Sequence, residues 1–360
     1  MKAKLIIYLI VLGMFSSCNT YYRKNAAFIN GKSDIYQILY YASLAGSSHN
    51  SQPWKVETLD NDTIKIYADT FRKLQAVDPT GRELYISLGA FIENLDIAAK
   101  SLGYKTVISI NDQDMNGILP VATVCLLKNH FPKNKSDLKE LELRNTIRIP
   151  FDTCPIKQND WRNLVATDSS AIHFIPAKSD HGGFIAKKEL EAYTIQSYQK
   201  SAQDELASWI RFSDKNIKEK QDGLTPAGMG IKGVGGFIVR NFYSPEDSKK
   251  ESFIEAGIKK TKNQVENCGG WILITQKANS IKEWINAGRL YERLNLKCRK
   301  MELGFHPMNQ IIEITAIKKE TSTLLRFSGE ITFIVRIGYV NDYPAPVSPR
   351  RSVENFTVFK

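Results

Sequence analysis

The feature that most constrains the fold of this chain is a weak internal repeat. Residues 86–100 read ISLGAFIENLDIAAK, and residues 285–299 read INAGRLYERLNLKCR. Four positions are identical at an offset of 199 residues (285 minus 86), and they are Ile86, Gly89, Glu93 and Leu95 with Ile285, Gly288, Glu292 and Leu294. The repeat predicts two similar halves, although four identities alone could also arise by chance.

Both copies of the repeat have the periodicity of a helix with one apolar face. Both starts have the spacing of a capping box, from Thr80 to Glu83 and from Ser280 to Glu283. Both ends read Leu-Gly-aromatic, where Gly103 and Gly304 suit a left-handed stop. The apolar positions are Leu88, Phe91, Leu95, Ala98 and Leu102 in the first copy and Ala287, Leu290, Leu294, Cys298 and Met301 in the second.

Apolar, β-branched segments lie on both sides of each predicted helix. Thr63–Tyr67 and Val121–Leu127 enclose the first helix, and Gly270–Thr275 and Thr332–Val340 enclose the second. The matched strands, starts and stops favour duplication over chance. The sequence therefore predicts an α+β fold in two tandem halves.

The N-terminus has the layout of an export signal. Lys2 and Lys4 precede the apolar run Leu5–Phe15, which is too short to span a bilayer permanently. Cys18 follows at the cleavage position, as in a bacterial lipoprotein signal. We expect residues 1–17 to be removed, Cys18 to be lipidated, residues 18–32 to act as a tether, and the protein to be extracytoplasmic and membrane-anchored. The alternative is an ordinary signal with a chance cysteine.

The formal net charge of +11 allows an anionic partner, but we see no run of five or six basic residues. An exported protein rarely meets nucleic acid, so no nucleic-acid partner is expected. The chain has five cysteines and no C-x-x-C pair, which argues against a zinc site or thioredoxin-type chemistry. Cys125 is predicted in a strand core and Cys298 on the apolar side of a helix.

The middle of the chain is rich in glycine. Gly228, Gly230 and Gly233 satisfy G-x-G-x-x-G, but the preceding segment is polar and ends in Pro226, so no strand leads into the motif. A dinucleotide-binding turn is therefore not expected. Residues 213–245 are predicted to form a mobile loop or lid.

Three polar segments could contact a ligand. Ser47–Trp54 compresses small hydroxyl and amide residues into one turn, and Trp54 is expected in the core. Arg144 and Arg148 bracket Thr146 and could converge on a phosphate, for which the guanidinium group is suited. Arg350 and Arg351 follow a proline-rich turn near the C-terminus. The alternatives are a plain polar turn, surface arginines at a helix end and a basic tail.

These segments resemble motifs of the nitroreductase superfamily. SSHNSQPW resembles its P-S-x-x-N-x-Q-P-W element, with Gly46 in place of the proline. RNTIR resembles R-R-S-x-R, with Asn145 and Thr146 at the substituted positions. Residues 78–104, WINAGRLYERL, LGFHPMNQ and the terminal SPRR resemble the Acg subgroup, and together the matches cover residues 33–360.

The resemblance implies a nitroreductase-like α+β fold in which a homodimer is fused into one chain. The halves would be residues 33–135 and 136–360, forming an internal pseudo-dimer that is monomeric or pairs again. One composite FMN site would lie between them. Its expected residues are Ser47, Ser48, Asn50 and Gln52 from the first half, Arg144, Thr146 and Arg148 across the interface, a turn of Pro307, Met308 and Asn309 at the isoalloxazine edge, and Arg350 and Arg351 at the phosphate.

The implied activity is hydride transfer from NAD(P)H through the flavin to a nitroaromatic or quinone-type acceptor. No protein acid or base is obligatory, so no catalytic residue and no metal are expected, and His49 and His306 are interpreted as structural. The alternative is an FMN-binding or FMN-sequestering lipoprotein with little turnover, because nicotinamide nucleotides are scarce outside the cytoplasm. A third reading is a lipoprotein that kept the fold and lost the cofactor.

Overall fold

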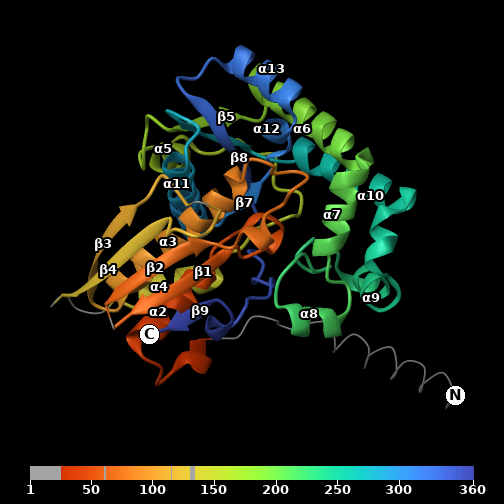
Figure 1. The fold of residues 1–360 in the computed structure, drawn as a ribbon. Coiled ribbons are helices and arrows are strands. Elements are labelled where there is room, and N and C mark those ends of the chain that lie inside the picture. The colour runs from red at the N-terminus through yellow and green to blue at the C-terminus, as the bar shows by residue number, and fades with distance from the viewer. Residues whose placement is uncertain (1–25, 61, 115, 130–133) are drawn as a thin grey trace, which may run out of the picture.

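The computed structural model describes residues 26–360 except residues 61, 115 and 130–133. Cys18 and the predicted signal lie outside the described residues. Two β-sheets flank a central pair of helices, and a further group of helices lies to one side (Figure 1). Within the described residues, no helix combines the length and the apolar character needed to cross a membrane.

The first sheet has five strands in the order β3-β4-β2-β1-β9. Neighbours are antiparallel, except that β9 from the C-terminus pairs in parallel with β1. Alternate residues of β2 are buried, as expected for a sheet with one face on the core. The strands are β1 (Trp54–Leu59), β2 (Thr63–Ala68), β3 (Tyr104–Ile110), β4 (Ala122–Lys128) and β9 (Thr357–Phe359).

The second sheet has four antiparallel strands in the order β5-β6-β8-β7. If β5, β6, β7 and β8 are taken as the counterparts of β1, β2, β3 and β4, the second sheet has the same strand order as β1-β2-β4-β3 of the first sheet. The predicted duplication of an α+β unit is therefore confirmed. The strands are β5 (Ile172–Pro176), β6 (Gly270–Gln276), β7 (Leu303–Pro307) and β8 (Glu330–Tyr339).

The two central helices, α3 (Arg82–Ser101) and α11 (Ile281–Lys300), are the two copies of the repeat. They cross at Gly89 and Gly288, where a Cβ on either glycine would overlap a backbone carbonyl of the other helix, that of Ile285 or Ile86 respectively. Each helix therefore contacts the other through equivalent residues, as the two subunits do at a two-fold interface. The repeated glycines exist because the two backbones touch.

Charged residues beside this crossing are paired differently in the two copies. Glu93 accepts from Arg289 at 2.8 Å and from Arg293 at 2.7 Å, and both arginines are partly exposed on α11. Its counterpart Glu292 is fully buried and lies 3.3 Å from the guanidinium Nε of Arg144. The repeated glutamates therefore hold α11 and the Arg144 segment in place.

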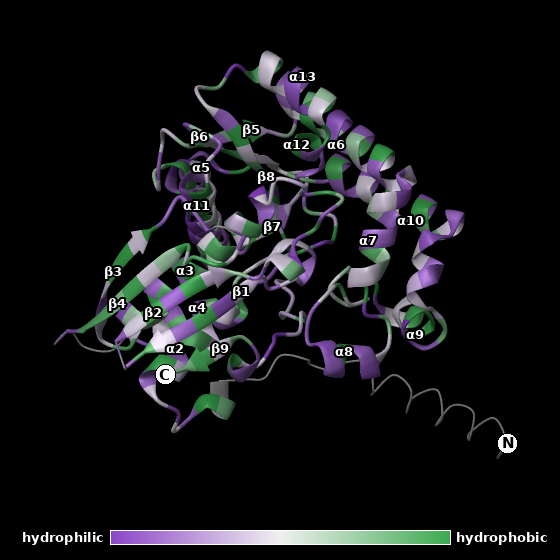
Figure 2. Cartoon of the chain, in the orientation of Figure 1, coloured by the Kyte–Doolittle hydropathy of each residue, from purple (hydrophilic) through white to green (hydrophobic). Residues whose placement is uncertain are grey.

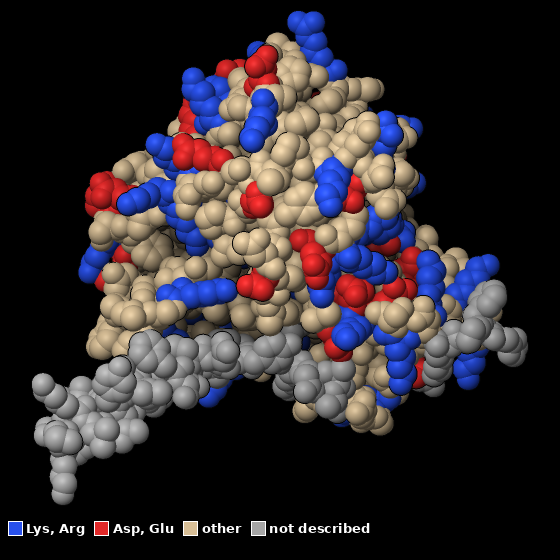
Figure 3. Space-filling view, turned by 180° about the vertical axis from the view of Figure 1, so that it is seen from behind, with Lys and Arg blue, Asp and Glu red and all other residues tan. Residues whose placement is uncertain are grey.

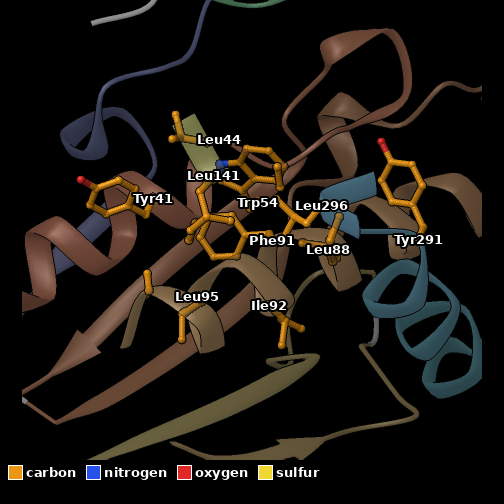
Figure 4. Packing of buried hydrophobic residues seen from close by; sticks show 14 of the residues in the cluster. Tyr41, Leu44, Trp54, Leu88, Phe91, Ile92, Leu95, Leu141, Tyr291 and Leu296 are labelled. Atoms are coloured by element: carbon orange, nitrogen blue, oxygen red, sulfur yellow. The ribbon is translucent and has the colours of Figure 1, made fainter. Parts of the chain in front are cut away.

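The main core extends across the central helices and reaches both sheets. Trp54 at the start of β1 is fully buried, as predicted, and its ring lies 4.9 Å from that of Phe91 on α3. Figure 4 shows these two rings among Leu88 and Leu95, with Tyr291 of α11 to one side. Burial of the α3 stripe explains its helical periodicity.

The ends of the central helices correct two predictions. Thr80 does not cap α3, because Asp78 Oδ2 accepts from the backbone N–H groups of Glu83 and Leu84 at 3.0 and 3.1 Å. Ser280 does cap α11, at 3.4 Å from the N–H of Glu283. Gly103 is left-handed after α3, but the residue at that place after α11 is Glu302, with φ 55°.

Gly304 has a different purpose from the predicted helix stop. It lies in β7, where the ring of Phe151 occupies the space that a Cβ would need. The prediction matched Gly304 with Gly103, but at the offset of 199 residues Gly103 corresponds to Glu302. The Leu-Gly-aromatic pattern was thus matched out of register.

The helical group between β5 and β6 corrects the prediction of a loop at residues 213–245. This segment contains two helices, and its glycines lie around the start of the second one, α9. The apolar residues after Gly236 recur at helical spacing, which the glycines obscure in the sequence. The group comprises α6 (Asp180–Tyr198), α7 (Lys200–Trp209), α8 (Asp214–Lys220), α9 (Gly233–Phe242), η4 (Pro245–Lys249) and α10 (Glu251–Glu266).

The remaining helices surround these layers. Helix α2 begins after its cap Ser33, and α4 leads into the Arg144 segment. Further bounds are η1 (Ala26–Ile29), α2 (Asp34–Ser43), η2 (Ser48–Asn50), η3 (Thr70–Arg72), α4 (Ser136–Leu143), α5 (Gln158–Val165), α12 (Gln310–Glu313), α13 (Thr315–Leu325) and η5 (Val353–Asn355).

The four cysteines within the described residues are free thiols. Cys298 is fully buried on α11, as predicted. Cys125 is only half-buried, because its side chain alternates away from the core face that Val124 and Leu126 share. The prediction of a core position for Cys125 is therefore wrong.

Candidate functional site

A cavity of about 580 Å³ lies where the two halves and the helical group meet. Its wall combines segments that are far apart in the chain. Of the predicted site residues, those that line it are Ser47, Ser48, Thr146, Arg148, Pro307, Met308 and Asn309.

The Ser47–Pro53 turn forms one side of this cavity and has an unusual backbone. His49, Asn50 and Gln52 have φ values of 48°, 53° and 52°, a left-handed conformation that costs non-glycine residues roughly 1–3 kcal/mol each. The turn is held by Ser47 Oγ, which accepts from Gln52 N at 3.0 Å, and by Ser48 Oγ, which donates to Glu83 at 2.6 Å. The surrounding contacts therefore hold a strained turn at the cavity.

The residue before this turn is Gly46, where the related motif has proline. The hydroxyl of Tyr291 occupies the position that a Cβ on Gly46 would take. Tyr291 itself lines the cavity from α11. The departure from the motif is therefore explained by the second half packing against the turn.

The other side of the turn faces the C-terminal tail. Asn50 Oδ1 accepts from Arg350 at 2.9 Å, and Gln52 Oε1 accepts from the backbone N–H of Arg351 at 2.9 Å. Arg350 also donates to the carbonyls of Leu44 and Ala45. The structure thus places Asn50, Gln52, Arg350 and Arg351 together, but not on the cavity wall.

The RNTIR segment runs from the core to the cavity. Arg144 is buried, where its Nε donates to the Leu44 carbonyl at 3.1 Å and faces Glu292. Arg144 is therefore used inside the protein, whereas Thr146 and Arg148 line the cavity. Of the predicted trio, the structure brings two to the candidate site.

Two cations share one end of the cavity. Arg148 donates to the carbonyl of Gly228 at 2.9 Å, and the ammonium of Lys260 on α10 donates to the carbonyl of Met229. Burial lowers the pKa of Arg148 to about 10, and burial together with Arg148 and Arg336 lowers the pKa of Lys260 to about 8. Two desolvated cations beside a cavity favour an anion.

Sequence reasoning missed Lys260. It is one of the three lysines of α10, all in the segment IKKTK, so its residue type carries no signal. In the folded helix it lies three or four residues from Ala256, Gly257 and Gln264, which also line the cavity. Position in the fold, not residue type, makes Lys260 part of the site.

Carboxyl groups form the opposite wall. Glu83 at the start of α3 accepts from Asn309 at 3.1 Å, and Glu313 accepts from Gln196 at 2.6 Å. Burial acts to raise the pKa of Glu83, but Arg82 and several hydrogen bonds hold it below its usual value. Burial and the charge of Glu83 raise the pKa of Glu313 well above its usual value. Of this pair, Glu313 is therefore the carboxyl group that favours its protonated form, and Glu83 is the one that favours its ionised form.

Both histidines of the site are neutral. Burial lowers the pKa of His49 to about 4, and burial with nearby cations lowers that of His306 well below its usual value. His306 Nδ1 lies 3.2 Å from the Arg336 guanidinium, so it accepts a hydrogen bond there. The described residues contain no cluster of side chains suited to a metal ion.

The helical group supplies the remaining wall. Its contribution is mainly apolar and aromatic, in contrast to the polar Ser47–Ser48 side. The residues include Tyr193, Leu206, Ile231, Val239, Tyr243 and Phe253. The cavity thus has a cationic end, an acidic wall and an apolar lobe.

No protein-family model matches the chain. The chain is 22% identical over 320 residues to the "Putative NAD(P)H nitroreductase acg" of Mycobacterium tuberculosis, covering 87% of this chain and 92% of that protein. It is 31% identical over 72 residues to the "Putative NAD(P)H nitroreductase Rv3131" of the same organism, 20% of this chain and 21% of that protein.

A solved structure, described as a putative nitroreductase from Anabaena variabilis, covers 90% of this chain and 94% of its own, with a TM-score of 0.41 and 10% identity. That likeness is too low to support any argument. The similarity to acg extends over nearly the whole chain and supports a relationship between this chain and the nitroreductase-like superfamily.

Proposed function

We propose that this chain is an NAD(P)H oxidoreductase of the nitroreductase type that holds FMN in the cavity between its halves. The observation that carries the proposal is the meeting of Ser47–Ser48, Thr146–Arg148 and Pro307–Asn309 at one cavity. The names of the curated relatives support the general class of activity.

The residues at the cavity fit this cofactor. A volume of about 580 Å³ is within the usual range of cofactor sites. Arg148 and Lys260 now donate to the carbonyls of Gly228 and Met229. A bound phosphate would replace these carbonyls as the partner of both cations. His49 Nδ1 is buried with no hydrogen-bond partner in the protein, so a polar ligand atom can satisfy it.

The residues have distinct tasks in this proposal. Arg148 and Lys260 would hold the phosphate, while Ser48 and Asn309 would orient the polar edge of the flavin ring. When bound, FMN supplies two-electron transfer between NAD(P)H and an acceptor. The apolar lobe excludes water from that edge.

The acidic wall can hold a proton at the site. Burial and the charge of Glu83 both raise the pKa of Glu313, which favours the protonated form of its carboxyl group. Glu83 in turn accepts from Ser48 at 2.6 Å, so a hydrogen-bonded path leads from Glu313 to the turn. We expect this path to supply a proton to a reduced acceptor.

The flavin is tested by an absorbance spectrum of the purified protein, then by heat release and chromatography. We expect FMN, because the cations gather at one point and no dinucleotide-binding turn is present. Recovery of FAD would contradict the proposal, and the absence of any flavin after reconstitution with FMN would leave only a cofactor-free fold.

The site is tested by Arg148→Ala, which should weaken FMN binding by about 1.5–3 kcal/mol, the scale of a hydrogen bond to a charged group. The matched control is Lys282→Ala, an exposed residue at the start of α11. Ser47→Ala should cost less than Arg148→Ala. Full flavin content in Arg148→Ala would show that the phosphate lies elsewhere.

Turnover is measured as NADPH oxidation with a short-chain quinone or a nitroaromatic. We expect oxidation to depend on the acceptor and to fall in Arg148→Ala in proportion to flavin content. Bound FMN without acceptor-dependent oxidation would instead indicate that the protein only stores the cofactor.

We also propose that the protein is exported and lipidated at Cys18. The supporting observation is the basic and apolar layout of residues 2–15 before Ser16-Ser17-Cys18. Mass spectrometry of the mature N-terminal peptide tests this, with Cys18→Ala as the control. A mature N-terminus at any other residue would contradict lipidation.

A further inference from the structure

None of the ten residues of helix α9 is fully buried, and those on its inner side, such as Phe237 and Val239, are only half-buried. A helix of this length is marginal in water unless one face packs on something. Its composition is apolar, and Figure 2 shows it in green beside the hydrophilic α8. The outer side of α9 is therefore an apolar surface that is open to a partner.

The outer face of α9 is a continuous apolar stripe. Val234, Ile238 and Phe242 lie four residues apart, so they share one side of the helix. They are 62%, 43% and 73% exposed. Contiguous apolar surface of this kind marks a docking site more often than chance exposure.

The inner face of the same helix belongs to the candidate site. Val239 and Tyr243 follow the outer residues by one position each and line the cavity, together with Phe253 of α10. Helix α9 is therefore a thin wall between the apolar lobe of the cavity and the outside.

The charges around α9 favour an anionic surface. Residues 227–245 contain two charged residues, Lys232 and Arg240, and both are basic. Arg240 pairs with Asp214 at 3.8 Å, which joins α9 to α8. The exposed charged residues of α8 are Lys215, Lys218, Lys220 and Glu219, so basic residues outnumber acidic ones there, while Glu246 and Asp247 follow α9 in η4. An apolar stripe beside lysines is typical of a helix that lies in the surface of an anionic bilayer.

The charges on the rest of the surface are mixed. Figure 3 shows Lys and Arg interspersed with Asp and Glu on the opposite view of the molecule. In Figure 1, the red start of the described chain and α8 both lie low in the view, and α9 lies just above α8. The predicted lipid anchor at Cys18 would hold this end near a membrane.

We propose that the outer face of α9 lies on an anionic lipid bilayer and that its inner face admits the apolar tail of a lipid-soluble quinone to the cavity. The proposal rests on the proposed function for its redox step. A quinone takes the two electrons and one proton of the NAD(P)H hydride plus one proton from water, which gives a quinol and NAD(P)⁺.

Membrane contact is tested in the full chain with Phe242→Trp and the control Leu324→Trp. Leu324 is 42% exposed on α13, at the opposite end of the molecule in Figure 1. Vesicles of phosphatidylcholine and phosphatidylglycerol carry a nitroxide on their acyl chains. We expect quenching of the added fluorescence at position 242 and none at position 324.

Equal quenching at both positions, or none at position 242, would overturn the membrane contact. A second copy of the chain is the competing occupant. In that case the tryptophan at position 242 becomes shielded from acrylamide as protein concentration rises without lipid, and this result would also overturn the proposal.

The acceptor is tested with the double variant Ile238→Ser and Phe242→Ser, against Leu324→Ser. Reduction of a long-tailed quinone in vesicles should fall by at least about tenfold, the scale of losing two buried apolar side chains. Reduction of a tailless quinone should match the parent at equal flavin content. An equal fall for both quinones would overturn the role of α9.

The two proposals fail in different ways. If the chain is no flavoenzyme, neither quinone is reduced by the parent protein, yet the quenching at position 242 still reports membrane contact. If only the α9 proposal is wrong, the parent reduces tailless quinone while position 242 is not quenched.

Discussion

In the first half of the chain, β1 and β2 are joined by residues 60–62, whereas in the second half β5 and β6 are joined by residues 177–269. The short connection leaves a plain antiparallel pair. The long one forms the helical group that supplies the apolar lobe of the cavity. The duplicated frame thus sets the architecture, and an insertion in one copy creates the asymmetry on which the site depends.

The residues of the site differ between the copies in the same way. At the offset of 199 residues, Glu83 and Ser87 correspond to Lys282 and Asn286, while Tyr291 and Asn309 correspond to Ile92 and Ile110. The frame residues, in contrast, are shared, as Gly89 and Gly288 show. The residues at the helix crossing are thus the same in both copies, whereas the polar residues at the cavity differ between the copies.

The largest expected effect comes from breaking the helix crossing with Gly288→Val. Its Cβ would overlap the Ile86 carbonyl and lie 2.9 Å from the Gly89 Cα, and neither backbone can move away. We expect a loss of roughly 4 kcal/mol or more in the free energy of unfolding, measured by urea denaturation. The control Gly183→Val has open space around its Cβ and should stay within about 0.5 kcal/mol. Similar losses in both variants would mean that the crossing is not a close contact.

The second-largest expected effect is a difference in stability loss between substitutions of the two repeated glutamates, Glu292 and Glu93. Glu292→Gln leaves the buried Arg144 without its carboxylate and should cost about 3 kcal/mol. Glu93→Gln weakens bonds to two partly exposed arginines and should cost about 1.5 kcal/mol. Both are read from urea denaturation at neutral pH. The reverse order would show that the Arg144 pair adds little.

The inserted helices should make stability depend on pH. Burial raises the pKa of Glu189 on α6 from 4.5 to about 8. Because the folded value is the higher one, its contribution is complete below pH 4.5 and is lost as the pH rises to about 8. The slope is at most about 1.4 kcal/mol per pH unit. Glu189→Gln should flatten this decline between pH 5 and 8, and an unchanged slope would assign it to other groups.

The smallest effect distinguishes the two helix starts. Ser280 caps α11, so Ser280→Ala should cost about 1 kcal/mol. Thr80 has no such bond to α3, so Thr80→Ala should change stability by less than about 0.5 kcal/mol. Thermal unfolding of the two variants at equal pH measures the difference. A larger loss for Thr80→Ala would restore the predicted capping box.

Much of the frame was predictable because it depends on local patterns. Apolar periodicity located α3 and α11, and the strands around them followed from β-branched runs. The predictions failed where a local pattern had two readings. Gly304 looked like a helix stop but meets Phe151, and the glycines before Phe237 hid the start of α9.

The site was predictable only in part. The resemblance pointed to the right segments, yet arginines of similar appearance have different surroundings. Arg148 reaches the cavity, while Arg144 meets Glu292 and Arg350 meets Asn50. Lys260 carried no sequence signal at all. Whether an arginine binds inside the protein or faces the cavity depends on partners that are more than a hundred residues away in the chain.

The sequence by itself determined the duplication, because two backbones that touch require glycine at matched positions and apolar stripes at helical spacing. Only the tertiary structure decided that the cavity lies between the two copies and the helical group, which cations face it, and that α9 separates it from the outside. Those outcomes depend on contacts between distant segments, and such contacts leave no local pattern in the chain.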